Sequence, residues 1–277
     1  MKYNFHSHSS FDDGKESMED FVLSAIEKGL MAFGFSGHTP LPMDNAWSLP
    51  GDVFPAYVEE MKRLQQKYKG RIQLYRGLEI DYIPDYSDNF DDLVHGVPLD
   101  YCIGSVHLVR KPGSEGPHNI WFIDGPREGY LKGIEEVFDG DPRAAVEAFY
   151  NQSSEMVSTQ KPDIIGHMDK VKMNNKGELF DTQSLWYRDA VDRLLGHIKA
   201  SGTIVELNTR GVYTGKTDEY FPSIPILEKC LHMDIPVMIN TDAHHPSQVD
   251  THFEEAVKLL KDIGFEKMKT PFFEVAL

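Results

Sequence analysis

Short apolar segments alternate with longer amphipathic segments along most of the chain. The first apolar segment, residues 2–8, predicts a β-strand. Ser17 then predicts a helix start, with Asp20 three residues later, apolar residues at helical spacing, and Gly29 at the end. The same pattern predicts further strands over residues 31–38, 73–82, 100–109, 163–169, 203–209 and 235–245. It predicts further helices over residues 55–68, 141–159, 184–201 and 251–264.

This alternation determines the expected fold class. Seven or so strands separated by helices imply a parallel sheet, because parallel neighbours need a crossover connection. At a length of 277 residues, a closed barrel is favoured over an open sheet. No linker-like stretch, internal repeat or low-complexity segment divides the sequence. We therefore expect one α/β barrel domain over residues 1–277.

Composition and charge restrict the possible partners. Acidic residues outnumber basic residues by 44 to 28, which gives a formal charge of −16. Nucleic acids and anionic membranes bind basic surfaces, so neither is expected as a main partner, whereas a small phosphorylated molecule stays possible. The two cysteines form no paired motif, and no apolar run approaches the roughly 20 residues that cross a bilayer. With no signal-peptide pattern, we expect a cytoplasmic protein and predict no oligomeric state.

Metal-binding residue types collect at the carboxyl ends of the predicted strands. His6 and His8 end the first strand, and as residues i and i+2 they share one face and can bind the same ion. The ends of the other strands carry His38, Glu79, His107, His167, Asp242 and His244. In a parallel α/β barrel these ends converge on one rim, where active sites are built.

One histidine at a strand end is more often structural than a ligand, and the pattern His-x-His alone is weak. However, six of the twelve histidines fall at the same end of five predicted strands, where core packing would select Val, Ile or Leu. The sequence therefore predicts a metal cluster. Imidazole and carboxylate donors without thiolate suit Zn²⁺, Mn²⁺ or Fe and select none of the three.

The order of these motifs resembles a known family. His-x-His is followed by DG, GH, the glutamate of GLE, SVH, GHMD and DAH, between residue 4 and about residue 250. This order resembles the PHP (polymerase and histidinol phosphatase) family of metal-dependent phosphoesterases. The segments GSVH, DIIGHMD, ELNTRG and NTDAHHP resemble its histidinol-phosphate phosphatase branch. The resemblance implies a distorted (β/α)7 TIM-like barrel that holds about three divalent metal ions.

The resemblance also implies how the ligands are shared. One ion would be bound by His6, His8, Glu79 and Asp242, with Glu79 bridging to a second ion. The second ion would add His107 and His167, and the third would be bound by Asp13, His38 and His244. Some relatives carry histidine in the segment of Asp13, and Asp12 is the neighbouring alternative.

The implied reaction is hydrolysis of a phosphate monoester, with L-histidinol phosphate as substrate and a role in histidine biosynthesis. A hydroxide bound by two ions is a nucleophile at neutral pH, because metal binding lowers the pKa of water toward about 7. No protein nucleophile is then required. Another small phosphate ester is the alternative substrate. An amidohydrolase and a non-catalytic metal-binding protein are the alternative classes.

Further residues near the strand ends could bind the substrate. Arg210 could bind phosphate through two parallel hydrogen bonds, and Lys170 and Lys172 could do so as point charges; the alternative for each is a solvated rim residue. His245 could contact the substrate or face solvent. Residues expected to orient ligand imidazoles are Asp81, Asp169 and Asn208.

Two long loops are expected at the same rim. They carry Trp47 and Trp121, and each ring could hold a flat substrate group or anchor its own loop. Acidic loop residues could receive a cationic amine of the substrate. The candidates for this role are Asp44, Asp81, Asp85, Asp88 and Glu115.

Overall fold

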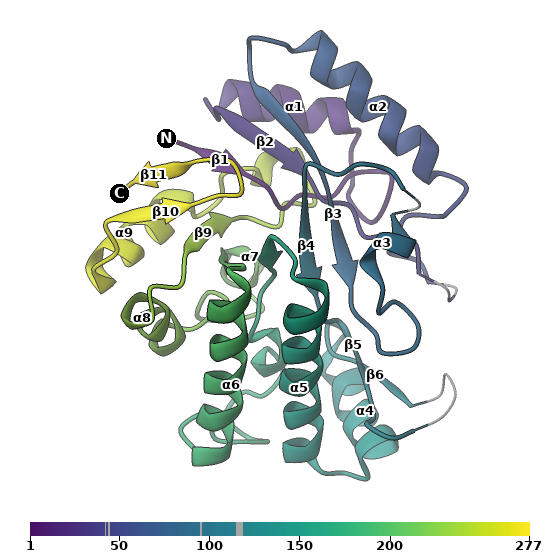
Figure 1. The fold of residues 1–277 in the computed structure, drawn as a ribbon, viewed down its shortest axis with the longest axis vertical. Helices are drawn as coiled ribbons and strands as arrows, with labels where there is room; N and C mark the ends of the chain where they lie inside the picture. The colour runs from purple at the N-terminus through teal and green to yellow at the C-terminus, as the bar shows by residue number, and fades with distance from the viewer. Residues whose placement is uncertain (42, 44, 95, 115–118) are drawn as a thin grey trace.

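The chain folds into a parallel α/β barrel (Figure 1). The computed structural model describes residues 1–41, 43, 45–94, 96–114 and 119–277. Within these residues the main sheet has seven strands, each parallel to its neighbours. In sheet order they are β1 (Tyr3–Asn4), β2 (Ala32–Phe35), β3 (Gln73–Asp81), β4 (Tyr101–Ser105), β7 (Ile164–Ile165), β8 (Ile204–Asn208) and β9 (Val237–Asn240). The prediction of one α/β domain with a seven-stranded barrel is confirmed.

The segments that follow the first and last strands nearly close this barrel. Ser7 forms a parallel bridge with Ala243. The backbone N–H of His8 donates to the carbonyl of Ala243 (2.8 Å), and the N–H of Ala243 donates to the carbonyl of His6 (3.1 Å). The residues that follow β1 and β9 are therefore held side by side at the carboxyl ends of the strands.

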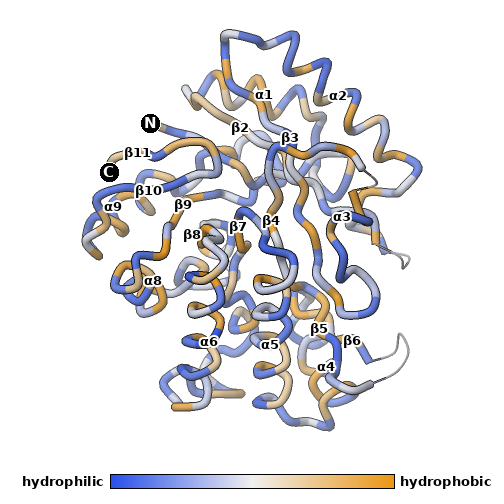
Figure 2. Tube along the Cα trace, in the orientation of Figure 1, coloured by the Kyte–Doolittle hydropathy of each residue, from blue (hydrophilic) through white to orange (hydrophobic). Residues whose placement is uncertain are grey.

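Helices cover the outside of the sheet. They are α1 (Met18–Glu27), α2 (Phe54–Lys67), α3 (Phe90–Leu93), α4 (Arg127–Phe138), α5 (Pro142–Gln160), α6 (Leu185–Ser201), α7 (Arg210–Tyr213), α8 (Ile224–His232) and α9 (Phe253–Ile263). Hydrophobic and hydrophilic stretches alternate along the longer helices in Figure 2, as expected for helices with one buried face. None of the described helices is long and apolar enough to cross a membrane.

The first helix begins and ends as its sequence predicts. Ser17 Oγ accepts a hydrogen bond from the N–H of Asp20 (3.3 Å), which satisfies one free donor of the first turn. Gly29 follows the helix with a φ of +74°, a backbone conformation that favours glycine. Met18, Phe21 and other apolar residues of α1 are buried against the sheet. Local sequence alone therefore determines this helix.

Other predicted boundaries were wrong. The strand expected over residues 100–109 is divided, because β4 ends at Ser105 and β5 (Leu108–Arg110) turns to pair antiparallel with β6 (Ile120–Phe122). β6 lies in the long loop that was expected to carry Trp121, and α4 follows in a stretch for which no element was predicted. A second unpredicted hairpin joins β10 (Lys267–Lys269) to β11 (Glu274–Ala276). Both hairpins have only three-residue strands, which pack against β9 or α4 rather than showing a long local pattern.

Gly77 on β3 cannot be replaced by a larger residue without a clash, because the ring of Tyr101 lies against it. Tyr101 on β4 is 2% exposed, and its hydroxyl donates to the carbonyl of Phe5 (2.5 Å). Gly77 pairs directly with Tyr101, and a Cβ atom at Gly77 would lie 2.4 Å from Cζ of that ring. No real Cβ fits at that distance, so either the ring or the strand would have to move.

We expect Gly77→Ala to lower the free energy of unfolding by about 1–3 kcal/mol, the usual cost of overpacking a close-packed core. The matched control is Gly196→Ala on the exposed side of α6, where an added Cβ meets nothing within 4 Å. That change should raise stability by about 0.5–1 kcal/mol, because alanine favours the helix. Denaturant unfolding of both variants tests this, and an unchanged midpoint for Gly77→Ala would contradict it.

Candidate metal centre

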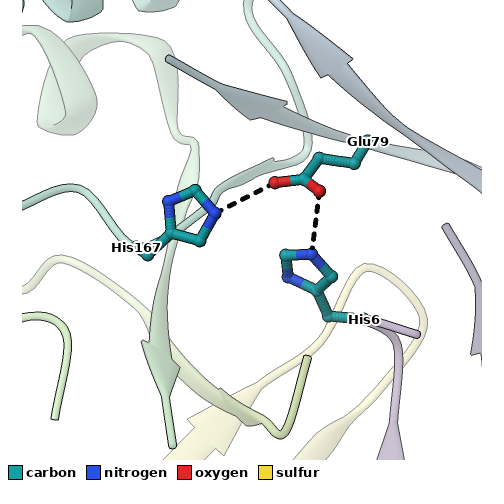
Figure 3. A group of neighbouring side chains, drawn as sticks. All are labelled: His6, Glu79 and His167. Carbon is teal, nitrogen blue, oxygen red and sulfur yellow. Dashed lines mark hydrogen bonds and ion pairs between the residues drawn. The ribbon is translucent and has the colours of Figure 1, made fainter. Parts of the chain in front are cut away.

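Glu79, near the end of β3, lies at the centre of a cluster of histidines. Figure 3 shows its carboxylate between two imidazoles: Oε2 is 3.2 Å from His6 Nε2, and Oε1 is 3.0 Å from His167 Nε2. Oε2 also lies 3.5 Å from His8 Nε2 and 3.3 Å from His38 Nδ1. The side chain of Glu79 is 1% exposed. One buried carboxylate therefore faces imidazole nitrogens from three different strand ends.

The nine predicted metal ligands all lie in this cluster. Each belongs to at least one group of three residues whose donor atoms lie within 4.8 Å of one another. The groups are His6–Glu79–His167, His6–His8–Asp242, His8–His38–Glu79, His8–Asp13–His244 and His38–Asp81–His107. The fold thus brings together every residue that the strand-end argument selected. Their division among particular ions stays a prediction.

The donor atoms of the cluster fit divalent metal ions. Four buried atoms of the cluster have no hydrogen-bond partner among the described residues: His6 Nε2, His8 Nε2, His38 Nδ1 and Asp13 Oδ1. Buried polar atoms are nearly always hydrogen-bonded, so a group of unpartnered imidazole nitrogens needs a partner of another kind. Imidazole nitrogen together with carboxylate oxygen is the donor set of Zn²⁺, Mn²⁺ and Fe sites.

Carboxylates behind the imidazoles fix their orientation. In three of the histidines the Nδ1 atom faces a carboxylate oxygen, while the other ring nitrogen faces the cluster. The pairs are His6 with Glu206 (2.6 Å), His8 with Asp12 (2.6 Å) and His107 with Asp81 (2.8 Å). Such partners fix the orientation of the ring and raise the basicity of a metal-binding imidazole.

The two neighbouring aspartates of the first loop, Asp12 and Asp13, have different contacts in the structure. Asp12 is engaged with the ring of His8 and also accepts hydrogen bonds from the N–H groups of Ser9 (2.8 Å) and His38 (3.2 Å). Asp13 Oδ2 lies 3.2 Å from His244 Nε2. Asp12 therefore holds the loop and an imidazole in place, whereas Asp13 is the one that faces the cluster.

Sequence reasoning missed Glu206 and misplaced two of the expected orienting residues. Glu206 is fully buried on β8; besides facing His6, it accepts a hydrogen bond from the N–H of His167 (2.9 Å). A glutamate between the apolar residues of the segment IVEL was the available signal. Asn208 Nδ2 donates to Asp242 (3.2 Å) and to Glu206 (3.0 Å), so it holds carboxylates of the site rather than an imidazole as expected. The expectation for Asp169 was wrong, because its carboxylate pairs with a lysine and a backbone N–H instead of an imidazole.

The cluster keeps its carboxylates ionised. Burial disfavours the charged form of Glu79, but the surrounding imidazoles, with His6 the strongest, hold its pKa well below the ordinary value. Burial acts in the same way on Asp242, and His6, His8 and Arg210 hold the pKa of that carboxyl well below its ordinary value. Both groups are therefore negatively charged near neutral pH, as metal binding requires.

A cavity of about 230 Å³ opens above the cluster. Its described lining residues are Asp13, His38, Trp47, Glu79, His107, Phe122, Asp124, Lys170, Arg210, Lys216, Asp242 and His244. The lining includes five of the predicted metal ligands in addition to Glu79, together with three cations and two aromatic rings. A space of this size suits one small molecule with polar groups.

The structure brings two of the four predicted substrate-binding residues to this cavity. Lys170 and Arg210 line it. Lys172 does not, because its ammonium is 2.8 Å from Asp169 and 2.5 Å from Glu219. His245 begins the short helix η2 (Pro246–Gln248), where its Nδ1 accepts a hydrogen bond from the N–H of Ser247 and its side chain is exposed. Neither Lys172 nor His245 is therefore proposed as a phosphate ligand.

The two tryptophans of the long loops have different surroundings. The Trp47 ring lines the cavity, 4.7 Å from the His38 ring between centroids. Trp121 is fully buried, and its Nε1–H donates to the carbonyl of Tyr130 (3.0 Å). Trp121 therefore anchors its own hairpin, and the possibility that it contacts substrate was wrong.

The three described acidic residues among those expected at the rim do not line the cavity. Asp81 is buried behind His107. Asp85 and Asp88 are exposed, and Asp85 pairs with Arg110. The other two candidates, Asp44 and Glu115, lie outside the described residues. Among the described lining residues, the one acid besides the predicted metal ligands is Asp124, which the sequence argument missed.

A barrel rim that gathers imidazoles and carboxylates below a small cavity is the site of a metal-dependent hydrolase. The PHP domain model matches residues 2–210, and the chain belongs to this family. It is a PHP-family metal-dependent phosphoesterase that resembles histidinol-phosphatases.

Individual relatives match nearly the whole chain. A Deinococcus radiodurans protein named "Probable histidinol-phosphatase" is 29% identical over 248 residues, which is 88% of this chain and 86% of the relative. The histidinol-phosphatase of Bacillus subtilis is 26% identical over 272 residues, 92% of this chain and 97% of the relative. The fold also matches a crystal structure of Lactococcus lactis histidinol phosphate phosphatase in complex with zinc, L-histidinol and phosphate. That match has a TM-score of 0.70 at 20% identity and covers 99% of this chain and 98% of the other.

Proposed function

We propose that this protein is a phosphomonoesterase that hydrolyses L-histidinol phosphate to L-histidinol and phosphate. The observation that carries the proposal is the buried cluster around Glu79 at the floor of a small cavity that also presents cations and aromatic rings. The names of the relatives and the ligands of the Lactococcus lactis structure support the choice of substrate.

The predicted ligands would hold about three divalent ions, with Glu79 between them. Such ions, when bound, supply positive charge for the phosphoryl oxygens and lower the pKa of water toward about 7. No serine, threonine or cysteine is among the described residues that line the cavity, so we expect no attacking hydroxyl or thiol from the chain. The nearby hydroxyl of Ser105 is committed, because it donates to Glu79 Oε1 (2.6 Å).

Two cations of the chain are placed to bind the phosphate group. Arg210 is anchored by a hydrogen bond from Nη1 to the carbonyl of Asp242 (3.0 Å), which leaves other guanidinium N–H groups for a phosphate oxygen. The Lys170 ammonium is 2.8 Å from Asp124 Oδ2 and 3.3 Å from His107 Nε2. Burial lowers the pKa of Lys170, but Asp124 and neighbouring carboxylates raise it overall, so the ammonium stays charged.

The shape of the cavity favours a compact phosphate ester over a polymer. About 230 Å³ is enough for one small molecule, and the Trp47 ring forms an apolar side on which a flat imidazole could pack. The charge of −16 also disfavours a polynucleotide substrate.

For the protein loaded with one metal, we expect kcat/KM for L-histidinol phosphate to exceed that for p-nitrophenyl phosphate and glycerol phosphate by more than tenfold, or about 1.4 kcal/mol. The measurement is steady-state phosphate release from the three substrates. A smaller preference would favour a general phosphoesterase. Activity on p-nitrophenyl phosphate alone would support phosphate monoester hydrolysis but rule out L-histidinol phosphate as the substrate.

A further inference from the structure

One carboxylate in the cavity has no role in the predicted metal centre. Of the four acidic residues among its described lining, three belong to the groups of possible metal ligands: Asp13, Glu79 and Asp242. Asp124 belongs to none of these groups. A negative charge at the entrance of a site for an anionic phosphate ester opposes binding, unless the carboxylate meets a positive part of the same substrate.

The surroundings of Asp124 leave one of its oxygens buried without a hydrogen bond. Oδ2 is 2.8 Å from the Lys170 ammonium, whose side chain is 8% exposed and therefore fixed. Oδ1 has no hydrogen-bond partner among the described residues. The Lys216 ammonium lies 3.5 Å from Oδ1, on a side chain that is 45% exposed and can turn toward solvent. A buried carboxylate oxygen with a loosely held cation can accept a second ammonium donor.

Aromatic rings border the same part of the cavity. Phe122 lines it two residues before Asp124, and its ring is stacked against Trp47 with centroids 6.4 Å apart and an angle of 13° between planes. On the other side, Lys170 connects Asp124 to His107 of the metal cluster. Asp124 is therefore joined through Lys170 to the candidate phosphate site and shares the cavity lining with two aromatic rings, against which the organic part of a small phosphate ester could pack.

We propose that Asp124 binds the ammonium group of the substrate and thereby selects phosphate monoesters that carry a cationic amine. This inference rests on the proposed function insofar as the phosphate binds at the metal cluster. An ester without the amine would leave Asp124 Oδ1 unpaired in a desolvated site, and an unpaired buried polar group is what makes an enzyme reject the incomplete substrate. The other possible role of Asp124 is only to hold Lys170.

A pair of substrates that differ only in the amine separates the two roles. L-histidinol phosphate is compared with 3-(imidazol-4-yl)propyl phosphate, on the metal-loaded parent, Asp124→Asn and Asp124→Glu. We expect Asp124→Asn to lower kcat/KM for L-histidinol phosphate by about 10- to 100-fold, the usual effect of losing a hydrogen bond to a charged group. The amine-free ester should change far less, and Asp124→Glu, which keeps the carboxylate, should recover part of the preference. The control Asp85→Asn removes an exposed carboxylate outside the cavity and should leave both substrates unchanged.

If Asp124→Asn is inactive, the role of Asp124 can still be tested by measuring binding. Calorimetry should show weaker binding of L-histidinol to Asp124→Asn than to the parent, with 4-(3-hydroxypropyl)imidazole unaffected. Equal losses for the amine-bearing and amine-free molecules would mean that Asp124 acts only through Lys170, and would overturn the proposal.

The proposed function can fail separately. If the parent shows no preference for imidazole-bearing esters, the same comparison is made with O-phosphoethanolamine and ethyl phosphate. An effect of Asp124→Asn confined to O-phosphoethanolamine would then support the role of Asp124 while rejecting L-histidinol phosphate as the substrate, and equal effects on both esters would overturn that role.

Discussion

Replacing Glu79 by glutamine is expected to lower phosphatase activity by at least about 10²-fold while the barrel stays folded. Both carboxylate oxygens face the cluster: Oε2 lies 3.2 Å from His6 and Oε1 lies 3.0 Å from His167. A glutamine side chain keeps the shape but replaces one oxygen by an N–H₂ donor, which cannot bind a metal ion. One negative charge is also lost where divalent ions would be closest together.

Circular dichroism, metal content and kcat/KM of Glu79→Gln test this expectation. The matched control is Glu59→Gln on the outer face of α2, whose side chain is 71% exposed and pairs only with Lys62 among the described residues. That control should match the parent in all three measurements, because exposed ion pairs contribute little. A Glu79→Gln variant with near-parental turnover would show that Glu79 is not a bridging ligand.

Removal of the metal ions is expected to abolish activity and to lower the melting temperature. The unpartnered nitrogens of His6, His8 and His38 need ions to compensate their burial, and any ligand that binds only the folded state stabilises it. At a free ion concentration of 100 times Kd, the stabilisation is about 2.7 kcal/mol for each independent site. Carefully purified protein should contain about three divalent ions per chain by elemental analysis. Fewer than one equivalent, not restored by reconstitution with Zn²⁺, Mn²⁺ or Fe²⁺, would contradict the prediction.

Adjacent histidines provide an internal control for this experiment. His244 faces Asp13 in the cluster, whereas His245 lies outside the cavity and bonds to its own turn. We expect His244→Ala to lower the metal content and the rise in melting temperature on metal addition. His245→Ala should behave like the parent in both measurements. Equal metal content and equal melting-temperature shifts for the two variants would show that His244 is not a metal ligand.

Much of the metal centre could be predicted because its residues occupy equivalent places in a repeated pattern. His6, His107 and His167 each follow an apolar strand, and a parallel barrel brings all such positions to one rim. The i, i+2 spacing of His6 and His8 further placed both on one side of an extended segment. Local signals of this kind also determined the start and end of α1.

Residues that complete the site from distant segments could not be predicted in this way. Glu206 meets His6 at 2.6 Å across 200 positions of sequence, and its strand shows only a buried glutamate. Asp124 reaches the cavity because the unpredicted β5–β6 hairpin turns back over the rim. Both contacts depend on how strands and loops pack against one another. A single sequence contains no periodic pattern from which this packing can be predicted.

The sequence by itself determined the strand–helix alternation, the rim and the residue types at each strand end, since these follow from local periodicity and the convergence of parallel strands. Only the tertiary structure decided which of two similar neighbours enters the cavity. Lys170 and Lys172 lie on one short turn, η1 (Lys170–Lys172), yet Lys170 points to the cavity while Lys172 pairs with Glu219. Residues i and i+2 of a 3₁₀ turn point about 120° apart, but the sequence does not show which of them faces the rim; the charges and space that the rest of the barrel provides decide this.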